Sequence, residues 1–589
     1  MSVPQKLTIS SLSAAYAAGQ TTPREVVQEI TSRAAAHGEH NVWIVAPSME
    51  LVEPYLARLE AMSANKRAAC ALWGVPFAVK DNIDLAGVPT TAGCPAYAYT
   101  PLESATVVQL LVDAGAIPVG KTNLDQFATG LVGTRSPYGE CRNALKPELI
   151  SGGSSSGSAV SVALGMAAFA LGTDTAGSGR VPAALHNLVG FKPPLGSWST
   201  AGVVPACASL DCVTVFANNL DDALAVDAAT AKPDTSCEWS REYSRKAPEF
   251  PRTVYIPKDE PRFYGPFKEE YRGAWKRALA QLGCIAAAQG SKVEELDTSY
   301  FSEIASILYD GPWVAERWSD LGAFVTEHGN DVFPVTKTIL ESGNRPDLTA
   351  ADMFQTYHRI TLARSHCAQL FENAVLVMPT AGGTFTRDEV REDPIATNSL
   401  MGLYTNHCNL CDLSAIAVPA GWAAEDLPFG ITAFSTAARQ NLTNGFAEAF
   451  LGASTVEVAV CGQHMRGLEL HGQLEELGAV FLKQTETAPC YRLFALPTSP
   501  VKPGLMRCAE SSGAAIQVET YLMSAHAFGR LVASTPGPLG FGSIELADGR
   551  IVKGFLAEAA ALLAPNGTPL PNVTEITATG SFKVWLQER

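Results

Sequence analysis

The chain has 589 residues, of which 47% are apolar and 17% are charged, and its formal net charge at pH 7 is −16. This length exceeds one ordinary hydrophobic core, so two or more domains are expected, and the composition excludes a disordered chain. The negative charge argues against a nucleic-acid partner, which would require basic surface stripes.

The compartment is indicated by the cysteines and by the apolar runs. The 13 cysteines are scattered without a repeating framework, which favours a reducing compartment over a secreted disulfide scaffold. The N-terminal stretch lacks the basic region and apolar core of a targeting signal. The longest small-apolar run, residues 159–172, is shorter than the ~20 residues that span a bilayer. We therefore expect a cytoplasmic protein with no membrane partner.

The first half of the chain predicts alternating helices and strands. Residues 8–19 and 22–38 have apolar positions at helical spacing, with Ser or Thr at the start and Gly at the end. "GVPFAVK" (74–80) indicates a buried strand, and residues 104–127 indicate a helix, a glycine turn and a second strand. This alternation predicts an α/β fold in which helices sandwich a mixed sheet.

Two further segments matter for the candidate site. The run 159–172 predicts a buried helix that opens after a glycine-serine loop, and "MAAFALGTD" (166–174) is expected to be helix and then a tight turn. Gly311-Pro312 should separate a helix that ends at Tyr309 from a helix whose opening turns contain Arg317.

The pattern changes near residue 454, where alternating strand signals become frequent. They are "VEVAVCG", "YRLFALP", "AAIQVETYLM", "GSIELADGRIVKGFL" and "SFKVWLQ". We expect a large α/β domain in residues 1–453 and a smaller, β-rich α+β domain in residues 454–589.

A nucleophilic serine is indicated in "GTDTAGSGR" (172–180). Small residues around Ser178 allow a ligand to approach the backbone closely. The N–H groups of Thr175, Ala176 and Gly177, with that of Ser178, are candidates for an oxyanion hole. The alternative is a glycine-serine turn without chemistry.

A second serine loop, "SGGSSSGSA", contains Ser154 and a formal G-x-S-x-G centred on Ser155. An α/β-hydrolase elbow would need a strand directly before it, and "NALKPELI" is a poor strand. The loop is therefore weak evidence for a hydrolase of that class.

Lys80 ends an apolar strand in "GVPFAVKDNID". Burial disfavours the charged form and lowers the pKa of a lysine, so a neutral lysine base is possible there. The alternative is a structural lysine paired with Asp81 or Asp84.

Together these segments resemble the amidase signature family over roughly residues 25–450. The resemblance rests on "GVPFAVKDN", "GAIPVGKTNLDQFA", "NALKPELISGGSSSGSAV" and "GTDTAGSGRVPAALHNLVGFKP". It implies that Ser178 is the nucleophile, that Ser154 relays the proton after a cis peptide bond to Gly153, and that Lys80 is the general base. His186 is then structural, because the proton path needs no histidine.

Two segments are similar to the allophanate hydrolase subgroup. They are "TNLDQFATGLVGTRSPYGECRN" (122–143) and "ILYDGPWVAERW" (307–318). The resemblance assigns Arg317 and Tyr309 to the substrate carboxylate, with the backbone near Gly130 assisting. An arginine offers a bidentate fork for such a group.

Residues 458–496 resemble the C-terminal domain of allophanate hydrolases, whose fold is similar to that of γ-glutamylcyclotransferases. Cys461 stands where a cyclotransferase would have a tyrosine, and its catalytic glutamate has no clear counterpart. The resemblance implies that this domain promotes decarboxylation of N-carboxycarbamate, with His464 and His471 as acid/base candidates or as structural histidines.

No cofactor and no metal are expected. "HCNLC" (407–411) offers one C-x-x-C with a histidine, but no second pair follows at ligand spacing. No biotin-carboxylase segment is present, so a separate urea carboxylase would supply allophanate. A homodimer is a family-level expectation.

The function expected is thus allophanate hydrolysis with release of ammonia. The alternatives are an amidase of another small carboxylated amide and an amidotransferase subunit that delivers ammonia to a partner.

Overall fold

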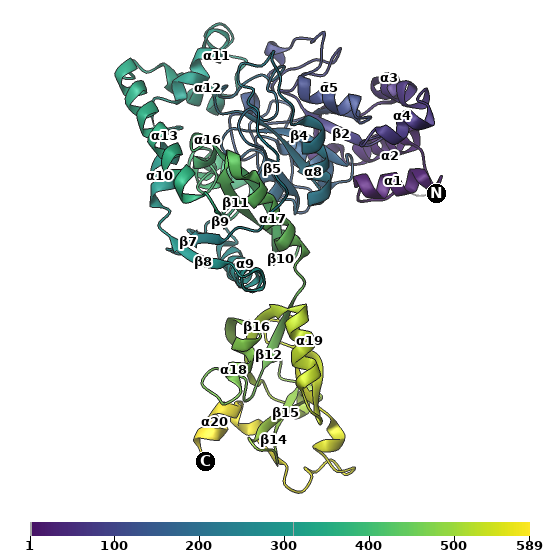
Figure 1. Cartoon of the computed structure of the whole chain (residues 1–589), viewed down its shortest axis with the longest axis vertical. Helices are drawn as coiled ribbons and strands as arrows, with labels where there is room; N and C mark the ends of the chain where they lie inside the picture. Colours follow the sequence, from purple (N-terminus) through teal and green to yellow (C-terminus); the bar gives the residue numbers. More distant parts are fainter. Residues whose placement is uncertain (1–2, 310) are drawn as a thin grey trace. The chain divides into compact units, whose positions relative to one another are not determined.

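The computed structural model describes residues 3–309 and 311–589 (Figure 1). The chain forms two compact units. The first comprises the residues up to Trp275 together with Val293–Leu451, and the second comprises Lys276–Lys292 together with Gly452–Arg589.

The first unit is built on a mixed sheet of eleven strands in the order β1-β3-β2-β4-β6-β5-β10-β11-β9-β7-β8. Strands β3, β2 and β4 run parallel near the β1 edge, whereas β4, β6, β5, β10, β11 and β9 are antiparallel neighbours. The strands are β1 (Trp43–Val45), β2 (Pro76–Lys80), β3 (Ile117–Thr122), β4 (Phe169–Asp174), β5 (Val189–Lys192), β6 (Cys212–Ala217), β7 (Thr253–Pro257), β8 (Lys292–Leu296), β9 (Ala374–Pro379), β10 (Leu413–Ala424) and β11 (Leu427–Thr436).

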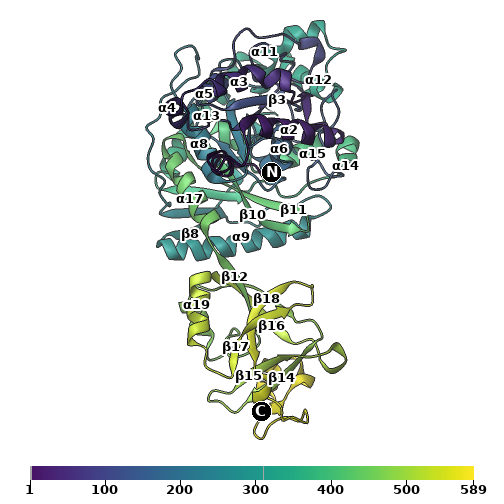
Figure 2. The same ribbon diagram turned by 90° about the vertical axis from the view of Figure 1, so that its right-hand side faces the viewer.

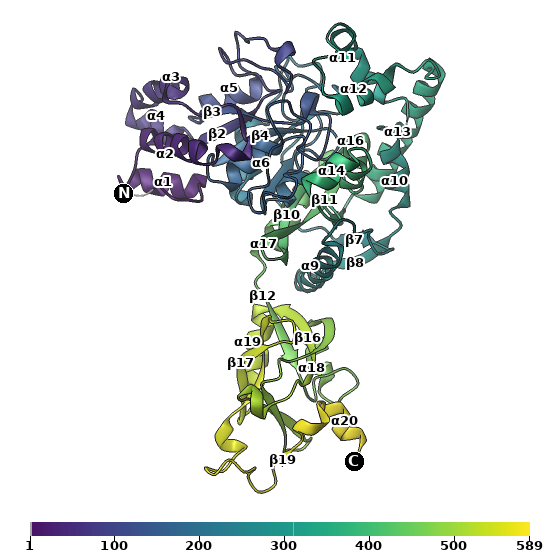
Figure 3. The same cartoon turned by 180° about the vertical axis from the view of Figure 1, so that it is seen from behind.

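Helices surround this sheet, with α1–α4 gathered at one end of the unit and α10–α13 at the other (Figures 1 and 3). They are α1 (Ile9–Ala17), α2 (Pro23–Ala36), α3 (Met49–Glu60), α4 (Ala64–Ala69), α5 (Thr106–Asp113), α6 (Ser156–Ala163), α7 (Val181–Ala184), α8 (Leu220–Thr230), α10 (Ser299–Ser306), α11 (Val314–Glu327), α12 (Pro334–Glu341), α13 (Ala350–Leu370), α14 (Arg387–Glu392), α15 (Ala396–Met401), α16 (His407–Leu410) and α17 (Gln440–Gly452). Helix α9 (Lys268–Gln289) begins in the first unit and belongs to the second unit from Lys276 onward. The expected α/β fold with a helix-covered mixed sheet is confirmed.

The N-terminal helices form where the sequence predicts them. Thr8 and Thr22 cap α1 and α2, and each begins a capping box with the side chain three residues later. Val26, Val27 and Ile30 form the buried face of α2.

The prediction of a helix in residues 166–174 is wrong. Helix α6 ends at Ala163, and Gly165 follows with a φ of 66°, a conformation that favours glycine. The next run, Phe169–Asp174, is the fully buried strand β4, paired with β2 and β6. A short apolar run that is buried on both faces has no periodicity to distinguish a strand from a helix.

The second unit contains a five-stranded sheet, β13-β16-β12-β18-β17, and a three-stranded sheet, β15-β14-β19. Figure 2 shows β12, β16, β17 and β18 together with α19 beside them. Its elements are β12 (Thr455–Val460), α18 (His471–Glu476), β13 (Val480–Glu486), β14 (Tyr491–Leu496), β15 (Lys502–Arg507), β16 (Gln517–Ser524), α19 (Ala525–Ser534), β17 (Leu539–Glu545), β18 (Ile551–Ala557), β19 (Thr574–Glu575) and α20 (Phe582–Gln587). This is the β-rich α+β fold expected.

One prediction of a strand in this unit is wrong. "SFKVWLQ" forms helix α20, because the Ser581 hydroxyl accepts a hydrogen bond from Val584 N–H and caps it, while Phe582 is buried.

Within the described parts of the chain, every helix is too short or too polar to traverse a bilayer.

Candidate active site and a second pocket

Lys80 lies at the end of the buried strand β2 and is fully shielded from solvent. Its Nζ is 2.8 Å from Ser154 Oγ and 2.6 Å from Thr173 Oγ1. Burial lowers the pKa of the amine to about 7, against the raising effect of more distant aspartates. A substantial fraction of Lys80 is therefore neutral near pH 7 and able to accept a proton.

The neighbouring carboxylates do not pair with Lys80. Asp81 Oδ1 is 3.3 Å from Lys121 Nζ on the adjacent strand, and Asp84 accepts a hydrogen bond from Tyr99. Among the described residues Lys80 makes no ion pair, so the alternative of a lysine paired with Asp81 or Asp84 is wrong.

The serine loop 151–157 presents Ser154 to Lys80. The Gly153–Ser154 peptide is cis, as the family resemblance implies. Ser155, the centre of the formal G-x-S-x-G, instead donates its hydroxyl to Thr173 C=O and accepts from Thr173 N–H. Ser155 therefore holds the loop against β4, whereas the Ser154 hydroxyl is hydrogen-bonded to Lys80.

Ser178 lies in the turn that follows β4, and this turn is closed by a buried ion pair. Arg180 makes two hydrogen bonds of 2.9 Å to the Asp174 carboxylate, which also accepts from the N–H groups of Gly177 and Gly179. The Ser178 hydroxyl projects toward Gly130 C=O at 3.5 Å.

The N–H groups expected to form the oxyanion hole are not equivalent. Gly177 N–H is already donated to Asp174 Oδ1 at 2.9 Å, so this donor does not fit the expected role. Ala176 is held by Thr405, which donates its hydroxyl to Ala176 C=O at 2.6 Å. The hydroxyl of Thr175 donates to Asp211. The candidates that remain are the N–H groups of Thr175, Ala176 and Ser178.

Asp125 organises the loop that contains Gly130. Its carboxylate accepts from the N–H groups of Val132, Gly133 and Arg135, and its own N–H donates to Ser154 C=O. A Cβ atom on Gly130 would lie 2.5 Å from Asp125 Oδ2. Only glycine therefore fits at position 130 beside this carboxylate. The close packing of this loop leaves the Gly130 carbonyl within 3.5 Å of Ser178 Oγ.

Arg317 is 1% exposed and lies in the opening turns of α11, as expected. Its Nη1 donates to Thr129 Oγ1 at 3.1 Å, and its guanidinium lies 5.3 Å from the centre of the Tyr309 ring. The helix end expected at Tyr309 is wrong: α10 ends at Ser306, and Tyr309 lies in the turn that follows. Among the described residues Arg317 forms no ion pair, and its buried Nε has no hydrogen-bond partner. A buried guanidinium without a carboxylate is suited to an anionic ligand.

Three residues beside this centre were not singled out from the sequence. Thr173 is hydrogen-bonded to Lys80, and Asp125 ties the serine loop to the Gly130 loop. Arg135 is 1% exposed and donates to Thr129 C=O and Pro394 C=O. Asp125 lies in "TNLDQF" and Arg135 in "GTRS", two segments within the stretch 122–143. The contacts of these residues form only after folding, so no signal in the sequence indicated their roles.

His186 has the structural role expected. It is buried, its Nδ1 is 2.8 Å from Pro182 C=O, and its Nε2 accepts from Ala144 N–H. Burial lowers its pKa to about 4, so the ring is neutral. In "HCNLC", the His407 ring packs between Phe301 and Phe434.

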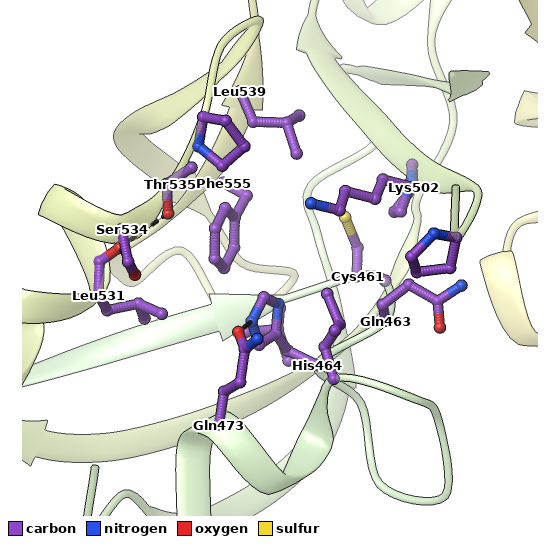
Figure 4. A pocket seen from close by; sticks show the side chains of 16 residues that line it. Cys461, Gln463, His464, Gln473, Lys502, Leu531, Ser534, Thr535, Leu539 and Phe555 are labelled. Carbon is purple, nitrogen blue, oxygen red and sulfur yellow. Dashed lines mark hydrogen bonds between the residues drawn. The ribbon is translucent and has the colours of Figure 1, made fainter. Parts of the chain in front are cut away.

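The second unit contains a pocket of about 140 Å³ between the loop after β12, the start of β15 and the end of α19 (Figure 4). His464 stands on one wall, stacked on Phe555 at 5.1 Å between ring centres. Its Nε2 is 3.1 Å from Gln473 Oε1. Because that oxygen only accepts, Nε2 carries the proton and neutral His464 keeps a lone pair on Nδ1. Burial lowers the pKa of this ring.

The same pocket contains a cation but no carboxylate among its lining residues. Lys502 lies across the pocket from His464, near Cys461 (Figure 4). Burial raises the pKa of the Cys461 thiol to about 12, so Cys461 stays protonated.

His471 does not line this pocket. Its Nδ1 is 3.1 Å from His464 C=O and its Nε2 is 3.5 Å from Glu475 Oε1. The structure therefore separates the two candidate histidines, with His464 at the cavity and His471 supporting its loop.

Comparisons with known proteins agree with both units. The family described as Amidase matches residues 25–443, and the allophanate hydrolase C-terminal domain matches residues 456–587. The urea amidolyase of Saccharomyces cerevisiae is 40% identical over 93% of this chain, which covers 31% of that protein. A glutamyl-tRNA(Gln) amidotransferase chain of Deinococcus deserti is 30% identical over 77% of this chain and 98% of its own length.

The chain thus spans about a third of the urea amidolyases that it matches. Among solved structures, the allophanate hydrolase of Kluyveromyces lactis superposes with a TM-score of 0.70 and 36% identity, covering 99% of both chains. This chain therefore belongs to the amidase family and, within it, to the allophanate hydrolases.

Proposed function

We propose that the chain hydrolyses allophanate and releases ammonia, with Ser178, Ser154 and Lys80 as the catalytic residues. The observation that carries this proposal is the environment of Lys80. A buried lysine with a pKa of about 7 and two hydroxyl partners is a base rather than half of an ion pair.

In the proposed first step, Ser178 Oγ attacks the amide carbon of allophanate. Its proton passes to Ser154, and the Ser154 proton passes to neutral Lys80. The N–H groups of Thr175, Ala176 and Ser178 stabilise the oxyanion. The tetrahedral intermediate collapses as the proton returns through Ser154 to the amide nitrogen, which leaves as ammonia. Water then attacks the acyl-enzyme by the same route and releases N-carboxycarbamate.

Arg317 and Tyr309 orient the substrate. The guanidinium is buried without a carboxylate and is held through Thr129 next to Gly130, whose carbonyl contacts Ser178. A substrate carboxylate bound there would place the carbonyl two bonds further along toward the nucleophile. This arrangement supports allophanate over an uncharged amide.

The second unit is proposed to promote decarboxylation of N-carboxycarbamate, a dianion that takes up one proton and yields carbamate and carbon dioxide. A pocket with one lysine, a neutral histidine and no lining carboxylate supports this role. Lys502 would bind one carboxylate, and the Nδ1 lone pair of neutral His464 would accept a hydrogen bond from the central N–H, while water supplies the proton that this nitrogen takes up.

The supply of allophanate is inferred from proteins that this chain resembles. A urea carboxylase would supply allophanate, consistent with relatives that are urea amidolyases. We further propose that the protein acts in the cytoplasm and as a homodimer.

The test is ammonia release from allophanate by the purified chain without ATP or a partner protein. We expect turnover under these conditions. An amidotransferase subunit, which is the alternative, would release ammonia only with its partner. Hydrolysis of neutral amides without hydrolysis of allophanate would contradict the proposed substrate.

A further inference from the structure

The helix that carries Arg317 is fastened to a neighbouring loop by one carboxylate. Glu316 accepts hydrogen bonds from Ser209 N–H and Ser209 Oγ, both at 2.7 Å, and from the Cys207 thiol at 2.9 Å. The loop 206–211 is therefore attached directly to the first turn of α11, beside Arg317.

The other side of the same loop is attached to the turn that contains the nucleophile. Asp211 accepts from the N–H groups of Ala206 and Cys207, at 2.8 and 3.1 Å, and from the hydroxyl of Thr175. Cys207 thus touches both carboxylates, Asp211 through its N–H and Glu316 through its thiol.

A second contact fixes the loop to the start of that turn. The Asn409 side chain donates to Asp174 C=O and to Leu210 C=O, each at 2.8 Å. Trp313, just before α11, belongs to the same buried cluster as Cys207 and Leu210. A continuous set of polar contacts, partly buried at Glu316 and buried at Asp211, therefore runs from α11 to Thr175, an oxyanion-hole candidate.

We infer that Glu316 is a positioning residue that couples carboxylate binding at Arg317 to alignment of the oxyanion turn. The inference rests on the proposed function. A substrate carboxylate that draws in Arg317 shifts the first turn of α11, and Glu316 passes that shift through loop 206–211 to Thr175. Binding of the substrate carboxylate then stabilises the transition state as well as the bound substrate. It therefore raises kcat and does not only lower KM.

The test is a double-mutant cycle of Glu316→Gln and Arg317→Ala, measured on allophanate and on malonamide, its neutral isostere. The glutamine keeps the shape but loses the charge and one acceptor. We expect Glu316→Gln to lower kcat on allophanate about tenfold, with KM changed less than about threefold and malonamide turnover within about twofold. The double variant should be no slower on allophanate than Arg317→Ala alone.

Two other variants separate coupling from damage to the fold. Ser209→Ala removes one donor to Glu316 without touching the site, and should lower kcat on allophanate about two- to threefold. Glu327→Gln makes the same charge change at the exposed end of α11 and should leave both substrates unaffected. Melting temperatures are measured for every variant.

The outcomes are distinguishable. Equal losses on allophanate and malonamide, or losses that multiply in the double variant, would overturn the coupling while leaving the proposed function intact. A wild-type chain that hydrolyses malonamide but not allophanate would overturn the proposed function and the coupling with it.

Discussion

The two candidate sites differ in how their reactive groups are held. In the first unit, Lys80, Ser154 and Ser178 are at most 4% exposed and come from separate segments. Three buried aspartates, Asp125, Asp174 and Asp211, bind backbone or hydroxyl groups around them.

In the second unit, the candidate groups surround a small cavity, and its lining has no carboxylate. His464 is fixed by one side-chain hydrogen bond and one ring contact. A covalent mechanism that moves a proton through two serines needs fixed geometry at several atoms, whereas decarboxylation needs mainly a shaped, weakly polar cavity. The first site should therefore be far less tolerant of substitution.

The largest loss is expected from Ser178→Ala, which removes the proposed nucleophile. Ammonia release from allophanate should fall by at least about 10³-fold, since the remaining groups cannot form an acyl-enzyme. Ser161→Ala, on α6, removes a hydroxyl that donates to Ser158 C=O; it is the matched control and should stay active. A Ser178→Ala variant with substantial turnover would show that the nucleophile lies elsewhere.

Lys80 should give the first site a characteristic pH dependence. Only neutral Lys80 accepts a proton, and its pKa is about 7. The rate should therefore rise with pH, reach half its maximum near pH 7, and fall about tenfold per unit below that value. Melting temperatures over the same range exclude unfolding as the cause.

Lys80→Arg tests whether basicity is what the site uses. Arginine keeps the positive charge but does not lose its proton in a protein, so the variant should be inactive at every pH. An active arginine variant would mean that charge alone suffices.

Arg317→Ala should produce a smaller and selective loss. A charge-assisted hydrogen bond contributes roughly 1.5–3 kcal/mol, so kcat/KM for allophanate should fall about ten- to a hundredfold. Hydrolysis of malonamide should change little because it has no carboxylate. If both substrates lose equally, Arg317 supports the fold rather than recognition.

The smallest effect on ammonia release is expected in the second unit. His464→Ala or Lys502→Met should leave the initial rate within about twofold of wild type, whereas carbon dioxide formation should lag behind ammonia. His526→Ala, an exposed histidine on α19, is the control. Unchanged carbon dioxide kinetics in both pocket variants would remove the proposed role of this pocket.

Much of the fold was predictable because its signals are local. The capping threonines of α1 and α2 and the apolar strand that ends at Lys80 each act within a few residues. The errors fell on short segments. Residues 169–174 became a strand through pairing with β2 and β6, and residues 582–587 became a helix through one capping serine and burial of Phe582. Pairing partners far apart in sequence decide the case of β4, whereas the cap of α20 is a local signal that the strand prediction overlooked.

By itself, the sequence determined which residues were candidates. Small residues around Ser178 and the apolar strand before Lys80 are local signals, whereas Ser154, Arg317 and His464 became candidates through the resemblance of their segments to a known family. Only the tertiary structure decided their states. Asp81 pairs with Lys121 and leaves Lys80 to Ser154 and Thr173, and Gly177 N–H is taken by Asp174. The pKa of a buried group and the availability of a donor depend on which distant side chains fold against it, and no local pattern carries that information.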